Sequence, residues 1–190
     1  MTEAAAFHAV LTGRLKKLGL AGGPVTVWVE GGALALAGAE SGRVLVAPAR
    51  VTRVRIGYSE SKSRRYHETK LWLADTGERV TLHPIWGHLP AYGAVMRDFA
   101  RAMEKAGALD RVERGDSIVT ALILPVLMGL LALAAIFIAV VVLEDEPWWG
   151  RIIVPIVPVV LTGVGIWLAA ARHWPRPIES LAELDKQLPP

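Results

Sequence analysis

The residues VTVWVEGGALALA, at positions 25–37, decide the fold class of the first half of the chain. Valines at every second position from Val25 to Val29 alternate with other residues, and Leu34 and Leu36 alternate with alanines. Alternation with a period of two is typical of a β-strand with one buried face. The pair Gly31–Gly32 between the two runs is typical of a tight hairpin turn. The stretch therefore predicts two antiparallel strands.

The same period continues on the C-terminal side of this hairpin. Further strands are expected at four places, namely residues 43–47, 51–58, 66–74 and from Val80 onward. Apolar residues then recur every three or four positions from Pro90 to Ala106, which predicts an amphipathic helix that Gly107 ends. We therefore expect an α+β domain over residues 24–110, in which an antiparallel sheet is closed by one C-terminal helix.

The N-terminal segment, residues 1–23, has a helical pattern. Phe7, Leu11 and Leu15 lie at helical spacing within residues 4–18, and basic residues follow late in the segment. The pattern predicts an amphipathic helix. It leaves two uses open, because such a helix can pack on its own domain or lie on a membrane surface.

Two long uncharged stretches dominate the last third of the chain. Residues 117–143 and 152–171 carry no charged residue, and about 20 apolar residues are enough to cross a bilayer. Residues 144–151 between them suit the turn of a helical hairpin. The pattern predicts two transmembrane helices, in keeping with a hydrophobic share of 53%.

The flanking residues predict how this hairpin is oriented. Basic residues precede the first stretch and follow the second, whereas the connecting turn is acidic, so both termini are expected in the cytoplasm and the turn in the periplasm. Four tryptophans near the ends of the stretches are candidate interfacial anchors: Trp148, Trp149, Trp167 and Trp174. We expect a multi-pass protein of the bacterial inner membrane, with residues 172–190 as a cytoplasmic tail.

The two stretches also indicate what the hairpin does. Neither contains an ionisable residue, which disfavours a transporter or a channel. Thr162, Gly163 and Gly165 form a patch of small residues where another helix could approach closely. Packing within the hairpin and contact with a partner or a second copy of the chain both fit this patch.

Basic residues gather around one hairpin of the predicted sheet. Arg53 and Arg55 lie on one strand, and Lys62, Arg64 and Arg65 lie at the following tip. Guanidinium groups in this arrangement suit phosphate oxygens or an anionic lipid surface. The alternative is a solvated hairpin whose charges protect a sheet edge from aggregation.

Few residues offer catalytic or metal chemistry. The chain has no cysteine, His67–Glu68 lacks the second histidine of a zinc-protease motif, and His83 and His88 lack carboxylates at ligand spacing. We expect no enzyme activity, no cofactor, no metal and no nucleic-acid partner. The tail pattern at residues 178–188 predicts a short amphipathic helix, which folds back onto the domain or the membrane, or else docks a partner.

The strand order with its single closing helix resembles the pleckstrin-homology-like (PH-like) superfold, as found in bacterial membrane-associated proteins. The resemblance rests on residues 43–54, the hairpin around Gly77 and the helix from Pro90. It implies binding of headgroups, peptides or proteins rather than catalysis. Its usual headgroup loop corresponds here to Glu30–Gly31–Gly32, which is not basic.

We expect a membrane-anchored interaction or scaffold protein, or an accessory subunit bound through its hairpin. The expected partners are the lipid bilayer, anionic headgroups, and a protein or a second copy.

Overall fold

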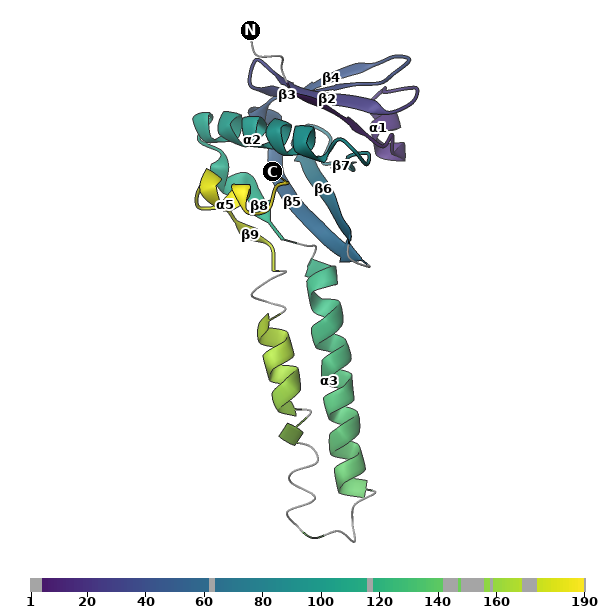
Figure 1. Cartoon of the computed structure of the whole chain (residues 1–190), viewed down its shortest axis with the longest axis vertical. Helices are drawn as coiled ribbons and strands as arrows, with labels where there is room; N and C mark the ends of the chain where they lie inside the picture. The colour runs from purple at the N-terminus through teal and green to yellow at the C-terminus, as the bar shows by residue number, and fades with distance from the viewer. Residues whose placement is uncertain are drawn as a thin grey trace. The chain divides into compact units, whose positions relative to one another are not determined.

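The computed structural model describes residues 5–61, 64–115, 118–141, 147, 156–157, 159–168 and 174–189. The chain divides into two compact units (Figure 1). Unit 1 comprises Met1–Gly115 together with Arg176–Pro190, and unit 2 comprises Asp116–Pro175.

The first sheet of unit 1 contains the hairpin expected from positions 25–37. Its four antiparallel strands follow one another in chain order, namely β1 (Ala6–Ala9), β2 (Val25–Glu30), β3 (Ala33–Ala37) and β4 (Arg43–Val46). Gly31 and Gly32 have φ angles of 58° and 81°. Positive φ at both central residues is what a two-residue hairpin turn of type I′ requires, so the glycine pair suits this turn. The predicted strands at 25–30, 34–36 and 43–47 are confirmed.

The second sheet of unit 1 has the order β7-β6-β5-β8-β9. Its strands are β5 (Val51–Ser61), β6 (Arg64–Leu73), β7 (Arg79–Leu82), β8 (Val112–Arg114) and β9 (Arg176–Pro177). β5, β6 and β7 form the expected meander, whereas β8 pairs with β5 in parallel. A short 3-10 helix, η1 (Pro48–Arg50), connects the two sheets, and η2 (Leu109–Arg111) precedes β8.

Helix α2 (Leu89–Lys105) packs on the buried faces of these strands, as the sequence predicts. All five apolar residues of its expected face are buried: Tyr92, Val95, Met96, Phe99 and Met103. The Tyr92 hydroxyl lies 2.9 Å from the Thr69 hydroxyl, and the Tyr92 ring meets Phe7 edge to face at 5.3 Å. Burial raises the pKa of Tyr92 above its usual value, so this hydroxyl stays neutral.

The N-terminal segment differs from the expected amphipathic helix. Residues 6–9 form strand β1, which pairs with β2 and buries Phe7 and Ala9, and only α1 (Gly13–Lys17) is helical. The Thr12 side chain caps α1 by accepting a hydrogen bond from the Leu15 N–H at 3.4 Å. The strand forms because β2 offers unpaired backbone groups, a contact that helical spacing does not reveal.

The tail folds back onto the rest of unit 1, which confirms one of its expected uses. β9 pairs with β8, and α5 (Leu181–Asp185) packs beside α2. Ile178, Leu184 and Leu188 are buried in the common core. The Arg97 Nε lies 2.7 Å from Asp185 Oδ1, so an ion pair adds to this apolar packing.

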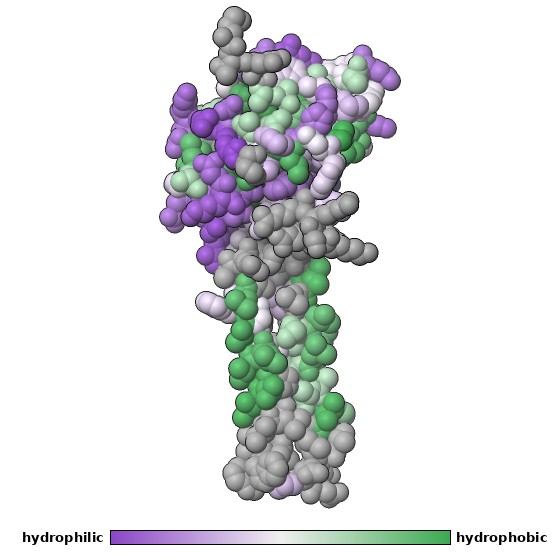
Figure 2. Space-filling model, in the orientation of Figure 1, coloured by the Kyte–Doolittle hydropathy of each residue, from purple (hydrophilic) through white to green (hydrophobic). Residues whose placement is uncertain are grey.

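Unit 2 contains α3 (Ile118–Val141), which has Pro125 inside it, and helical residues 159–168. The Thr162 hydroxyl donates a hydrogen bond to the Met128 carbonyl oxygen at 3.0 Å, which joins the two helical segments. Most large apolar side chains described in this unit are exposed, among them Leu130, Phe137 and Val160. Figure 2 shows hydrophobic residues over the surface of these segments.

The prediction of a transmembrane hairpin is wrong. Among the residues that the structure describes, no helix combines the length and the apolarity needed to cross a membrane. This finding also overturns the predicted inner-membrane localisation.

Candidate functional site

The basic hairpin predicted from the sequence is only partly described. Arg64 and Arg65 begin β6, where they pair with Ser61 and Glu60, but their side chains and the whole of Lys62 lie outside the described part. Arg53 and Arg55 are described, and both contact the carboxylate of Glu113. These two guanidinium groups are therefore already engaged by a carboxylate of their own chain.

Glu113 is the centre of an ion-pair network on the outward face of the second sheet. Its Oε2 accepts hydrogen bonds from Arg55 Nε at 3.1 Å and from Arg55 Nη2 at 2.9 Å. Its Oε1 lies 2.9 Å from Arg53 Nε. Parallel pairing of β5 with β8 puts Arg55 opposite Glu113, and both side chains are largely buried. The network stabilises the sheet rather than offering free cations.

Trp72 covers the two arginines of this network. The guanidinium carbons of Arg53 and Arg55 lie 5.5 Å and 5.4 Å from the centre of the Trp72 ring. Both distances are within the range of cation–π attraction. Trp72, on β6, is also the register partner of Arg79 on the neighbouring strand β7. Trp72 thus connects the ion-pair network to the edge strand β7.

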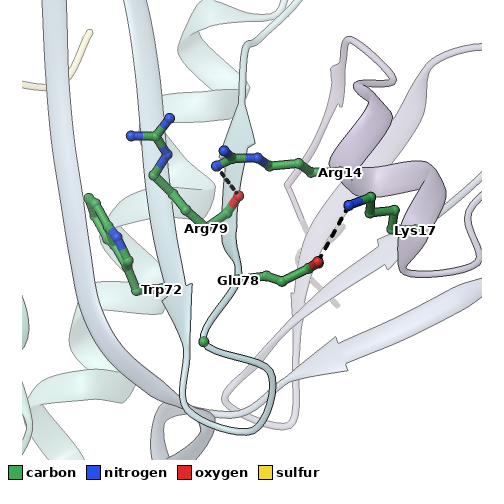
Figure 3. A pocket seen from close by; sticks show the side chains of 6 residues that line it. Arg14, Lys17, Trp72, Glu78 and Arg79 are labelled. Carbon is green, nitrogen blue, oxygen red and sulfur yellow. Dashed lines mark hydrogen bonds and ion pairs between the residues drawn. The ribbon is translucent and has the colours of Figure 1, made fainter.

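A surface depression of about 420 Å³ lies beside this edge strand (Figure 3). It is lined by Arg14, Lys17, Trp72, Gly77, Glu78 and Arg79. Arg14 and Lys17 come from α1, where a spacing of three residues puts them on one helix face. Gly77, with a φ of 64°, lies in the turn between β6 and β7 and leads the chain into Glu78 and Arg79. The depression therefore forms where α1 meets the start of β7.

Two of its three cations are partly engaged and one is not. Arg14 Nη1 donates a hydrogen bond to the Arg79 carbonyl oxygen at 2.9 Å, and Lys17 Nζ lies 3.8 Å from Glu78 Oε1. Within the described part of the chain, the Arg79 guanidinium makes no ion pair or hydrogen bond, and Arg79 is exposed. Three cations and one carboxylate give the lining a formal charge of +2. The depression is thus suited to an anion.

The turn beside the depression also contains an acid, Asp75, which is neutralised by another arginine. Arg50 donates a hydrogen bond to the Asp75 carboxylate, and this bond holds the pKa of Asp75 below its usual value. The carboxylate stays ionised and engaged with Arg50. Its charge therefore does little to cancel the positive lining.

The histidines have different surroundings. His67 is buried near the rings of Tyr58 and Tyr92, His83 is exposed, and the rings of His8 and His88 lie 4.7 Å apart. Among the residues that the structure describes, no three or more histidines and acidic residues gather as a metal site would require.

The candidate helix-packing residues face different surroundings. Thr162 is bonded to Met128, and a Cβ placed on Gly165 would lie 3.9 Å from the Met128 side chain. A Cβ on Gly163 would meet nothing within 4 Å. Two of the three residues therefore lie where α3 and residues 159–168 pack together, which favours packing within unit 2.

The candidate interfacial tryptophans are described only in part. The exposed fraction of Trp167 is 69% and that of Trp174 is 41%. Trp148 and Trp149 lie outside the described residues. Their predicted role as membrane anchors depended on the hairpin and has no support without it.

Comparison with known proteins identifies no relative. No protein-family model, no curated protein and no solved structure matches this chain.

The depression is not apparent from the sequence. Arg14 and Lys17 were expected only as part of the basic end of an amphipathic helix, and Arg79 was not singled out. A signal was present in the spacing of three between Arg14 and Lys17. What α1 would face could not be predicted, because the contact joins residues 65 positions apart.

Proposed function

We propose that the chain is a non-enzymatic interaction or scaffold protein whose unit 1 is a PH-like binding domain. The observation that carries the proposal is that unit 1 has one closed core and a separate outward face. Two sheets, α2 and the tail enclose one core, while the outward face at Trp72 and Arg79 takes no part in that core. Antiparallel strands in chain order followed by a closing helix resemble the PH-like superfold, and this analogy supports a binding role.

A second candidate function is favoured by unit 2. Large apolar side chains that stay exposed over a continuous segment mark surfaces that another apolar surface covers. Leu127, Leu130 and Leu131 in α3 are each more than half exposed, as are Val157 and Leu161 from the second helical segment. On this view the chain is an accessory subunit of a larger complex, with unit 2 making the contacts.

Exchanging unit 2 distinguishes the two candidates. Residues 118–168 are replaced by an unrelated helical pair, and tagged wild-type and exchanged chains are purified from the native host. If unit 1 binds the partner, the same protein should be recovered with both chains, because the surface at Trp72 and Arg79 is unchanged. Quantitative mass spectrometry of the eluates measures the recovery.

The reciprocal variant supplies the control. Arg79→Glu and Lys17→Glu, introduced together, reverse two exposed charges of unit 1 and leave unit 2 as it is. Recovery lost in this variant and kept in the exchanged chain supports the leading candidate. The opposite pattern supports an accessory subunit bound through unit 2.

A further inference from the structure

We propose that the depression lined by Arg14, Lys17, Trp72 and Arg79 binds the phosphate group of a phosphorylated side chain on a protein partner. The inference rests on the proposed role of unit 1 as a binding domain and names the chemistry of its ligand. It is carried by the charges in the depression, by the groups that remain available there, and by the acids that surround it.

The available groups are of the kinds that bind phosphate. The Arg79 guanidinium is exposed and, in the described residues, is engaged by no acceptor, so its fork of N–H donors can take two oxygens at once. Lys17 adds a mobile point charge, since its side chain is 70% exposed and lies 3.8 Å from its nearest carboxylate oxygen. Figure 3 shows these side chains around the same opening, with Arg14 beside the Arg79 backbone.

The charge of the lining matches a dianion. Three cations and Glu78 give a formal charge of +2, and a phosphorylated side chain carries about −1.5 to −2 at neutral pH. A single carboxylate would leave about one positive charge unmatched. The binding of phosphate also draws Lys17 away from Glu78, which costs little because an ion pair between exposed side chains is weak in water.

The surroundings favour a protein ligand over a membrane surface. A bilayer presents many negative charges over a wide plane, and it is attracted by extended basic clusters. Here Glu78 lies in the depression itself, so a wide anionic plane would meet its carboxylate. A single phosphate can instead be contacted by Lys17 and Arg79 together.

The test measures binding of defined probes to the purified full chain by isothermal titration calorimetry. The probes are a short glycine–alanine peptide around one phosphoserine, the same peptide with serine, free phosphoserine, and vesicles containing phosphatidylserine. We expect the phosphopeptide to bind and the serine peptide to bind at least about tenfold more weakly, because charge-assisted hydrogen bonds are lost. Binding should weaken as salt is added, since the site is exposed.

Three variants assign this binding to the depression. Arg79→Gln and Lys17→Gln should each weaken phosphopeptide binding by about tenfold, the effect of losing one charge-assisted bond. Lys16→Gln is the matched control. It removes the same charge from an exposed residue of the same helix, but Lys16 does not line the depression. It should change binding less than twofold, because water and salt screen a charge that does not contact the ligand. Both test positions are exposed, so the variants should fold, which circular dichroism verifies.

Several results would overturn the proposal. Equal losses in Lys16→Gln and Lys17→Gln would show a general charge effect, and equal binding of the serine peptide would exclude phosphate. Preferential binding of the vesicles over the phosphopeptide would exclude a protein ligand. A partner that is recovered through unit 1 while phosphopeptide binding fails would refute this ligand and leave the binding role of unit 1 intact.

Discussion

Replacing Glu113 by alanine is expected to lower the free energy of unfolding by about 3–5 kcal/mol, the cost of removing one partner from a buried ion pair. The Arg55 side chain is only 7% exposed and gives two hydrogen bonds to Glu113 Oε2. Without the carboxylate, Arg55 would remain charged, largely buried and close to a second guanidinium, that of Arg53. Urea unfolding of the full chain, followed by circular dichroism, measures the change in midpoint.

Two further variants separate the buried charge from simple loss of contact. Arg53→Ala should cost only about 1 kcal/mol or less, because its side chain is 46% exposed and Arg55 keeps its partner. The double variant Arg55→Met with Glu113→Leu removes both charges and should restore most of the stability lost in Glu113→Ala. If Glu113→Ala is as stable as Arg53→Ala or more stable, Glu113 does not compensate a buried charge on Arg55.

Removing the tail is expected to have the second large effect. A chain that ends at Pro177 loses Ile178, Leu184 and Leu188, whose exposed fractions are 3%, 1% and 6%. Each side chain contributes about 1.5–3 kcal/mol when fully buried, and part of this is offset by the conformational entropy of ordering the tail. The free energy of unfolding of unit 1 should therefore fall by about 3 kcal/mol, seen as a lower thermal midpoint.

Single substitutions locate this effect within the tail. Leu184→Ala should cost about 2–5 kcal/mol by the cavity that it leaves beside α2, whereas Lys186→Ala, at an exposed position, should cost less than about 0.5 kcal/mol. An unchanged thermal midpoint after truncation would mean that the tail does not stabilise unit 1. The alternative use of the tail, docking a partner, would then regain support.

Much of unit 1 could be predicted from periodicity because each element has a strong local pattern. The glycine pair at 31–32, the alternation from Val51 to Tyr58 and the apolar face of α2 each predict an element that the structure contains. The short strand β1 was missed because Phe7, Leu11 and Leu15 fit helical spacing as well. Pairing with β2 decided between the two, and a pairing partner is not part of a local pattern.

The candidate site was less accessible for the same reason. Arg53 and Arg55 were correctly placed on one strand face, but the carboxylate that engages them lies 58 residues after Arg55. The depression was not predicted at all, because α1 and β7 come together only in the folded chain. Arg55 and Arg79 look alike in sequence but differ in role. Arg55 is buried and paired with Glu113, whereas Arg79 is exposed.

The sequence by itself determined the strands β2 to β7, the closing helix α2 and the helical tail, because alternation and helical spacing act within a few neighbouring residues. Only the tertiary structure decided that β8 pairs in parallel with β5, that β9 returns to β8, and that Glu113 neutralises Arg55. It also decided which cations stay available, at Lys17 and Arg79. The physical reason is that burial and charge pairing depend on groups far apart in the chain, which meet only when both sheets have formed.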